Sequence, residues 1–248
     1  PGAAPAETPE AMGLRIAEEA DRRDLGWGDS TAAMKMVLTN SHGDTSERVL
    51  RMQSLENPDP KDGDRTKIVF DHPRDVKGTA LLTWTHILAP DDQWLFLPAL
   101  KRVKRISSSN KSGSFMGSEF AYEDFSSQEV AKYAWKWLRD EPCGELSCFV
   151  LERTPLYENS GYTRQVVWMD QAEYRGQRVD FHDRKDTLLK KLTMSDYRRY
   201  LDRYWRAHDL FMENVQNGKT TRLTWEDYAF RTGLGEGDFT KNSLQRTR

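Results

Sequence analysis

The segment Ser30-Thr-Ala-Ala-Met-Lys-Met-Val-Leu-Thr39 decides the fold class of this chain. Its large apolar side chains stand on alternate residues, at Met34, Met36 and Leu38. An alternation of this kind is typical of a β-strand with one buried and one solvated face. The same alternation recurs at Ile68 and Phe70 and at Leu82 and Trp84. The sequence therefore predicts a sheet with one apolar face.

The composition agrees with a half-buried sheet. The 248 residues are 37% hydrophobic with a mean hydropathy of −0.80, yet they include 8 Trp, 10 Phe and 9 Tyr. That aromatic content excludes a disordered chain. A sheet with one solvent-exposed face explains both the polar composition and the aromatic content, because every second residue of its strands can be polar.

The charge pattern does not favour a nucleic-acid partner. The net charge is −2, and the richest basic cluster, Lys101 to Arg105, is interrupted by Val103. A solvated strand or loop explains this cluster. No stretch approaches the roughly 18 consecutive apolar residues that predict a membrane-spanning helix.

Two helices are predicted. Thr8 suits the N-cap of the first, Pro9 its first position, and Met12, Ile16 and Ala20 one face of it. The second follows from the capping-box spacing of Ser126 and Glu129. Its apolar stripe comprises Val130, Tyr133, Ala134, Trp137 and Leu138.

Twelve segments are predicted to be strands. Before the second helix they are 30–39, 48–53, 66–70, 79–88, 93–97 and 102–107. After it they are 148–152, 163–169, 178–182, 188–195, 208–214 and 220–228. No helix interrupts either group, so the sheet should be an antiparallel meander. Asn217-Gly218 predicts a type I′ hairpin between the last two strands, and Gly233 to Gly237 a polar tail.

No motif indicates a catalytic centre, a cofactor or a metal. Gly218-Lys219-Thr220 lacks the earlier glycine of a phosphate-binding loop, and no Gly-x-Ser-x-Gly sequence is present. The five histidines are far apart, without the spacing that places two ligands on one helix face. Cys143 and Cys148 flank Gly144. They would close a small loop in an oxidising compartment, but two free thiols fit the sequence equally well.

An apolar sheet face without catalytic residues suits a carrier for an apolar ligand. Methionines in such a wall would make it adaptable. The residues predicted to line a lipid cavity are Met34, Met36, Leu50, Met52, Ile68, Phe70, Leu82, Trp84, Trp94 and Phe96. A shift of one residue in any strand would move its side chains to the other face.

Several runs resemble the outer-membrane lipoprotein-sorting protein family, in its LolA-like branch. They begin with Gly26-Trp-Gly-Asp-Ser30, the run from Gln93 to Ile106, and Gly117-Ser-Glu-Phe-Ala-Tyr-Glu-Asp-Phe125. Further along are Ser160-Gly-Tyr162, Val166-Val-Trp-Met-Asp170, Thr193-Met-Ser-Asp-Tyr197, Tyr204-Trp205 and the run from Trp225 to Leu234. The resemblance extends over about residues 13–245.

The resemblance implies a mainly β (α+β) fold. Its strongly curved antiparallel sheet would form an unclosed half-barrel, as in LolA and LolB, with helices covering the concave face. It implies one LolA-like domain over residues 9–248, behind a flexible leader at 1–8. It also implies export to the periplasm of Gram-negative bacteria, with the signal peptide absent from this chain, and a cavity that holds acyl chains.

Three hypotheses follow for the function. The first is a periplasmic carrier that passes a lipid or lipidated cargo between the inner and outer membranes, together with an RND-type exporter. Its two helices would form a lid, and its membrane contact would be transient. The second is a non-carrying docking subunit of an exporter, using Lys101 to Arg105. The third is a lipid-acting enzyme that uses His72 or His86. The first hypothesis is not enzymatic, and the oligomeric state is not predicted.

Overall fold

The computed structural model describes residues 6–57, 59 and 62–246, so most of the predicted leader lies outside the described residues. One α-helix, α1 (Pro9–Arg23), precedes the strands. Thr8 caps it as expected, because its Oγ1 accepts a hydrogen bond from the Ala11 amide at 3.1 Å. Ile16 and Ala17 are buried on its inward face.

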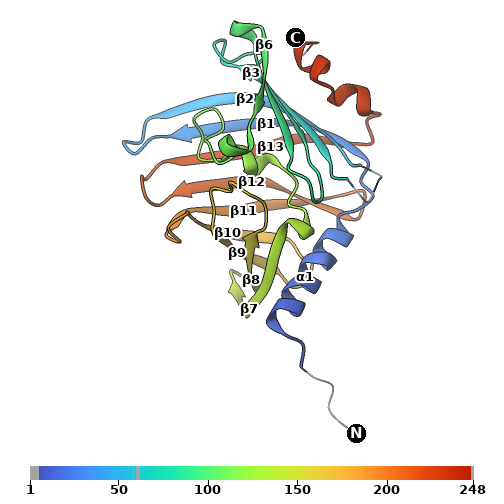
Figure 1. Ribbon diagram of the computed structural model, residues 1–248, viewed down its shortest axis with the longest axis vertical. Coiled ribbons are helices and arrows are strands. Elements are labelled where there is room, and N and C mark those ends of the chain that lie inside the picture. The colour runs from blue at the N-terminus through green and yellow to red at the C-terminus, as the bar shows by residue number, and fades with distance from the viewer. Residues whose placement is uncertain (1–5, 58, 60–61, 247–248) are drawn as a thin grey trace.

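Among the described residues, thirteen strands form one antiparallel sheet (Figure 1). They are β1 (Asp29–Thr39), β2 (Thr45–Leu55), β3 (Arg65–His72), β4 (Ala80–Trp84), β5 (Asp92–Leu97), β6 (Arg102–Ile106), β7 (Tyr133–Cys143), β8 (Leu146–Pro155), β9 (Arg164–Asp170), β10 (Gly176–His182), β11 (Leu188–Tyr200), β12 (Tyr204–Asn214) and β13 (Thr220–Phe230). The spatial order is β6-β5-β4-β3-β2-β1-β13-β12-β11-β10-β9-β8-β7. The predicted mainly β, unclosed antiparallel sheet is therefore confirmed.

The order of the strands explains how the sheet is covered. β6 and β7 are adjacent in the chain but lie at opposite edges of the sheet. The intervening residues 107–132, which we call the strap, must therefore cross from one edge to the other, and they run in front of the central strands in Figure 1. The strap contains three 3₁₀ turns, Ser108–Asn110, Tyr122–Phe125 and Val130–Lys132, and one isolated β-bridge between Ser114 and Ala121.

The predicted second helix is wrong. Its C-terminal half is strand β7, which pairs with β8, and its capping-box residue Ser126 only follows a 3₁₀ turn. The aromatic residues Tyr133, Trp135 and Trp137 also alternate with period two, so the segment satisfies both periodicities. Pairing with β8 across the Gly144 turn decides between them, because tertiary contacts override local preference. Helices thus cover less of the sheet than the resemblance implied.

Two smaller predictions also need correction. The β12–β13 connection is a four-residue loop closed by the Asn214 amide on the Lys219 carbonyl at 2.9 Å. Only Gly218 of the Asn-Gly pair has a positive φ, whereas a type I′ turn needs two such residues. The predicted polar tail is instead docked on the sheet, since Phe239 and Leu244 are fully buried there.

A raised carboxyl pKa marks the end of the strap. Burial first, and the nearby Asp64 carboxylate second, raise the pKa of Glu129 to about 7. Burial is also the main cause that raises the pKa of Asp64 to about 6. An ideal Cβ on Gly63 would lie 2.9 Å from Glu129 Oε1, so Glu129 is packed against the β2–β3 loop. Ionisation of Glu129 therefore opposes closure of this end of the strap.

Helix α1 packs directly on the backbone of β7 at Gly13. This contact predicts how a methyl group added at Gly13 would change the stability of the fold. A Cβ at Gly13 would lie 2.7 Å from the backbone N and C atoms of Lys136. In a free helix, Gly→Ala would stabilise by about 1 kcal/mol. We expect Gly13→Ala instead to lower the free energy of unfolding by about 1–3 kcal/mol, through overpacking. Urea denaturation measures this.

The control for that change is Gly235→Ala, because Gly235 has a φ of −135° and no atom within 4 Å of the added Cβ. We expect this control to leave the denaturation midpoint almost unchanged. A stabilised Gly13→Ala protein would show that α1 does not pack tightly on β7.

Glu129 also predicts a pH dependence of stability. Its pKa is higher in the folded protein than the usual value of about 4.3, so the folded state binds the proton more tightly. The contribution is therefore fully present below about pH 4 and is lost as the pH rises toward 7. We expect Glu129→Gln to flatten this decline in melting temperature between pH 5 and 8. The control Glu226→Gln, at an exposed residue, should show the same decline in melting temperature as the unmodified protein. An unchanged decline in Glu129→Gln would show that Glu129 does not cause it.

Candidate functional site

One continuous apolar cluster lines the inner face of the sheet, which we define as the face under the strap. Its buried residues come from β1 to β6 and from β9 to β13, as well as from the strap itself. Of the residues predicted to line a cavity, the cluster contains Met34, Met36, Leu50, Ile68 and Phe70, with Met52 packed against it. These five are at most 2% exposed.

Four residues predicted for the same cavity lie on the opposite, outer face. Leu82, Trp84, Trp94 and Phe96 contact the C-terminal residues Phe239 and Leu244. The Trp84 indole N–H donates to the Phe239 carbonyl at 2.7 Å.

The error is one of strand parity. Ile68 pairs with Leu81, and Leu81 pairs with Leu95, so those two leucines share the inner face with Ile68. Leu81 and Leu82 are both leucines, and the loop before them hides the register. The alternation alone therefore could not choose the face.

The strap seals the inner face with aromatic rings. Phe115 is fully buried, and Phe120 is 3% exposed. The Phe115 ring lies 5.7 Å from that of Phe70 and 4.6 Å from that of Phe125, between centroids. Sequence analysis missed this role, because the strap lacks a regular period. The signal available was a set of phenylalanines in a Ser- and Gly-rich stretch.

Two adjacent carboxylates anchor the strap to the sheet. Asp124 accepts a bond of 2.8 Å from the Lys190 ammonium, and both side chains are almost fully buried. The Tyr162 hydroxyl also donates to Asp124, at 2.9 Å. Removing one partner of such a buried pair leaves an uncompensated charge, so these contacts hold the strap in one position.

Glu123 makes the second set of anchoring contacts. It accepts from the Tyr157 hydroxyl at 2.9 Å, the Ser160 hydroxyl at 2.8 Å and the Gly161 amide at 2.8 Å. Burial raises the pKa of Glu123, with Asp124 adding to the rise. The strap is thus anchored by polar contacts on one side and apolar contacts on the other, and the inner face beneath it is filled by side chains. The buried rings of Phe115 and Phe120 occupy part of the apolar surface that was predicted to line a cavity.

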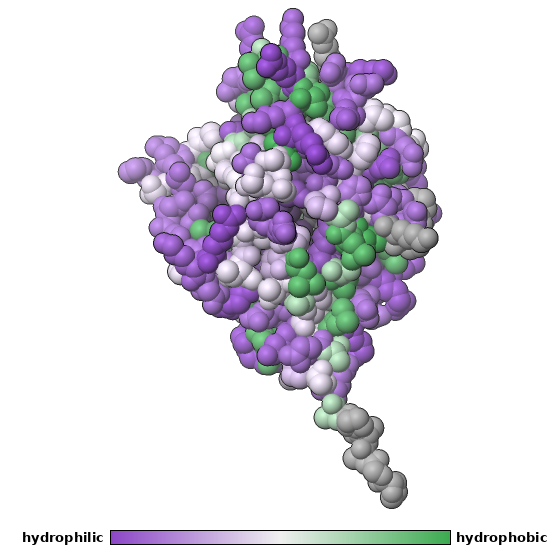
Figure 2. Space-filling model, in the orientation of Figure 1, coloured by the Kyte–Doolittle hydropathy of each residue, from purple (hydrophilic) through white to green (hydrophobic). Residues whose placement is uncertain are grey.

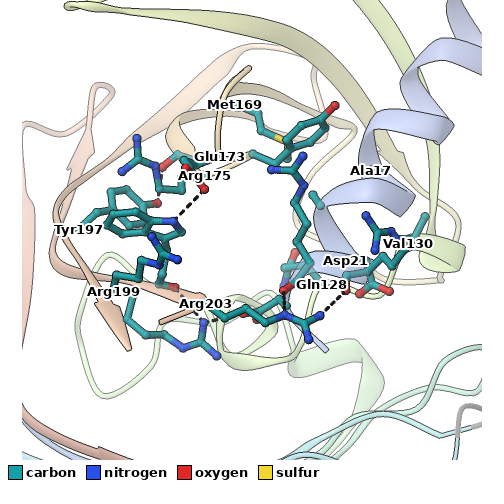
Figure 3. Close-up of a pocket in the computed structure, with 18 of the residues that line it drawn as sticks. Ala17, Asp21, Gln128, Val130, Met169, Glu173, Arg175, Tyr197, Arg199 and Arg203 are labelled. Carbon is teal, nitrogen blue, oxygen red and sulfur yellow. Dashed lines mark hydrogen bonds and ion pairs between the residues drawn. The ribbon is translucent and has the colours of Figure 1, made fainter. Parts of the chain in front are cut away.

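Several pockets open at the protein surface, and one of them lies beside the strap. A pocket of about 800 Å³ is bounded by the C-terminal half of α1, the β9–β10 turn and the end of the β11–β12 hairpin. Figure 3 shows Ala17, Met169, Arg175, Tyr197, Arg203 and Gln128 arranged around one opening. The face of the molecule seen in Figure 2 is mostly hydrophilic, with several apolar areas.

The pocket has an apolar floor. Ala17, Trp135 and Met169 line it and also belong to the cluster in which α1 packs on β7 to β9. On the sheet, Met169 follows Val167 by two residues on β9, and Val167 is part of the inner-face cluster. The floor therefore continues the inner face past the edge of the strap.

The rim of the pocket is basic and aromatic. Among the described residues that line it, seven are arginines and four are aspartates or glutamates. Arg175 lies 4.6 Å from the centroid of the Trp205 ring, and Arg23 lies 4.3 Å from that of Tyr174. These arginines come from α1, β8 and the region 175–206, so no local sequence pattern could have revealed their convergence.

The remaining predicted features are placed as follows. A disulfide joins Cys143 and Cys148 across the β7–β8 hairpin. His72 is exposed, and His86 lies between Asp62 at 2.6 Å and Asp92 at 3.2 Å, so these histidines do not meet in the pocket. Lys101 to Arg105 occupies β6 and the turn before it, where charged residues suit an unpaired sheet edge.

The described residues hold neither a metal-binding cluster nor a membrane-spanning helix. No group of three or more His, Cys, Asp or Glu side chains in this part of the chain is placed to hold a metal ion. Within the same residues, no helix combines the length and apolar character needed to cross a membrane.

Comparison with known proteins identifies close structural relatives. The chain is 56% identical to a domain from Vibrio parahaemolyticus described as an outer membrane lipoprotein-sorting protein, with a TM-score of 0.92. The match covers 95% of this chain and 99% of that domain. A LolA superfamily protein from Nitrosomonas europaea shares the fold at 21% identity and a TM-score of 0.72, covering 93% of this chain and 98% of its own.

The family itself follows from two further matches. A family model described as "Uncharacterized protein" matches residues 62–246. A DUF1329 family protein from Desulfovibrio piger is 31% identical with a TM-score of 0.90, and the match covers 96% of this chain and 99% of that one. Among curated proteins, none matches this chain. The chain belongs to the DUF1329 family, and its fold is that of the LolA superfamily.

Proposed function

We propose that this protein is a non-enzymatic periplasmic carrier that binds a lipid or the acyl chains of a lipidated protein. The observation that carries the proposal is the apolar inner face, which is shared by both halves of an open sheet and is closed by a strap without regular structure. The similarity to a lipoprotein-sorting domain supports the same function.

The energetics favour an acyl chain as the ligand. Each methylene group transferred from water to an apolar site contributes about 0.8 kcal/mol. The pocket floor supplies a first apolar contact at Trp135 and Met169. Further methylenes would be buried by displacing the Phe115 and Phe120 side chains, which now occupy the inner face. In this account the strap and the ligand compete for one apolar surface.

The strap, rather than a pair of helices, is the element that would move. Its contacts with the sheet are side-chain contacts and isolated hydrogen bonds, such as the Glu119 amide to Thr221 Oγ1 at 2.9 Å. A segment without strand pairing to the sheet can leave it without breaking a β-ladder, so its opening costs less than global unfolding.

The Cys143–Cys148 disulfide supports a periplasmic location, because disulfides persist in oxidising compartments and are rare in the cytosol. Export would place the protein between the two membranes of a Gram-negative cell, where a carrier can receive cargo from the inner membrane. Delivery from an RND-type exporter is part of this proposal.

Native mass spectrometry of the whole protein tests the proposal. The protein would be stripped of bound lipid, incubated with phospholipid vesicles and separated from them. We expect adducts with the mass of one or two acyl-bearing molecules, because the pocket and the inner face offer one continuous apolar site.

A matched sample incubated in the presence of excess detergent should carry no such adduct. Repeated absence of any lipid adduct, both after incubation and in protein purified from periplasm, would contradict a carrier function.

A further inference from the structure

The pocket beside the strap combines two chemical characters that one ligand could satisfy. Its floor is apolar at Ala17, Trp135 and Met169, whereas its rim carries seven arginines against four acidic residues among the described lining residues. The chain as a whole has a net charge of −2, so this excess of positive charge is local. An amphiphile with an anionic headgroup has the same two characters.

Some of the rim arginines are already neutralised. Arg175 pairs with Asp170 at 2.7 Å, and Arg206 pairs with Asp24 at 2.6 Å. Arg22 and Arg23 share a single carboxylate, that of Glu19. The charges of these four arginines are therefore largely balanced by carboxylates.

Two other rim arginines have only uncharged partners. Arg153 donates to the Gln165 side-chain oxygen at 2.8 Å, and Arg199 donates to the Asp202 backbone carbonyl. Within the described residues, no carboxylate lies within ion-pair distance of either guanidinium. Both charges are therefore available to a ligand.

A third arginine is partly engaged by the helix end. Arg203 donates to the Arg22 and Arg23 carbonyls, each at 3.3 Å, where the C-terminus of α1 carries partial negative charge. Arg203 thereby offsets the negative partial charge of the helix C-terminus, one of the features of the pocket wall that would repel an anion.

Aromatic rings orient the guanidinium groups. Arg153 lies 4.7 Å from the centroid of the Tyr133 ring, and Arg175 lies over Trp205 and Tyr197. A guanidinium stacked on a ring keeps its N–H donors in its own plane, away from the ring face. Planar donors held in this way match the paired oxygens of a phosphate, with which arginine forms bidentate hydrogen bonds.

We propose that this pocket binds the phosphate headgroup of an anionic lipid at its arginine rim, where Arg153 and Arg199 have no carboxylate partner, with the acyl chain running along the floor toward the inner face. This inference rests on the proposed carrier function and specifies the class of cargo. It places the headgroup at the rim, which is open to solvent, and the chain where the strap now closes the sheet.

The test compares three probes on the lipid-free protein by native mass spectrometry and competition. The probes are phosphatidylglycerol, the uncharged diacylglycerol with the same chains, and glycerol 1-phosphate without chains. We expect phosphatidylglycerol to be retained at least about tenfold better than diacylglycerol, since hydrogen bonds between arginine and phosphate are charge-assisted and stronger than neutral ones. Glycerol 1-phosphate should compete only weakly.

Variants connect the preference to the two arginines. The double variant Arg153→Gln/Arg199→Gln should lose the preference for phosphatidylglycerol and still retain diacylglycerol. The control is Arg198→Gln, since Arg198 neighbours Arg199 on β11 but pairs with Asp196 at 2.7 Å and does not line the pocket. Arg199→Lys should give an intermediate preference, because it keeps the charge and loses the planar fork. Circular dichroism checks that each variant is folded.

The outcomes separate this inference from the proposal on which it rests. Equal retention of diacylglycerol and phosphatidylglycerol by the unmodified protein would overturn the headgroup site and leave the carrier function standing. If the unmodified protein retains neither phosphatidylglycerol nor diacylglycerol, both proposals are overturned. Glycerol 1-phosphate that binds as tightly as the lipid would overturn the assignment to a lipid headgroup.

Discussion

Burial of one apolar sheet face beneath the strap is the constraint on which the rest of the structure depends. The sheet is open, so its inner face cannot be buried by closure into a barrel. Because β6 and β7 lie at opposite edges, the chain must cross that face once, and the crossing segment carries Phe115 and Phe120 to it. The same crossing that completes the topology therefore also supplies the cover.

This arrangement separates the apolar and polar tasks of the strap. Its phenylalanines bury apolar surface. Asp124 fixes its position through Lys190 of β11, and Glu123 does so through hydroxyl groups of the β8–β9 loop. Phe125, which follows these carboxylates directly, packs on the inner-face cluster. A displaced strap would thus expose the inner face and two carboxylates together. The exposed carboxylates would regain water, which lowers the cost of opening.

Much of the fold could be predicted from the sequence, because alternation is a local property. The segment 30–39 and ten of its counterparts are strands over most of their predicted length, whereas 79–88 is a strand only over Ala80–Trp84. Helix α1 begins at the predicted cap. The wrong predictions share one cause, because in each case the structure depends on pairing with a strand that the local sequence does not indicate. Pairing with β8 turned an apparently helical stripe at Tyr133 and Trp137 into β7, and pairing with Ile68 turned Leu81 inward instead of Leu82.

The site was harder to predict than the fold for the same reason. Met34, Met36, Leu50, Ile68 and Phe70 were found because each repeats a strand pattern, yet they contribute to a filled core. The arginines that give the pocket its charge are spread over α1, β8 and residues 175–206, and nothing in their local sequence connects them. Only the packing of α1 against the sheet brings them together.

The central claim is that the strap opens independently of the sheet. Hydrogen–deuterium exchange of the backbone amides tests it most directly, by comparing residues 113–125 with the central strands β1 and β13. The account predicts that the amides of Phe115 and Tyr122, which bond within the strap, exchange through a local opening far faster than those of Met34 or Leu223. Exchange of the strap amides only at the slow rate of the central strands, with global unfolding, would contradict it.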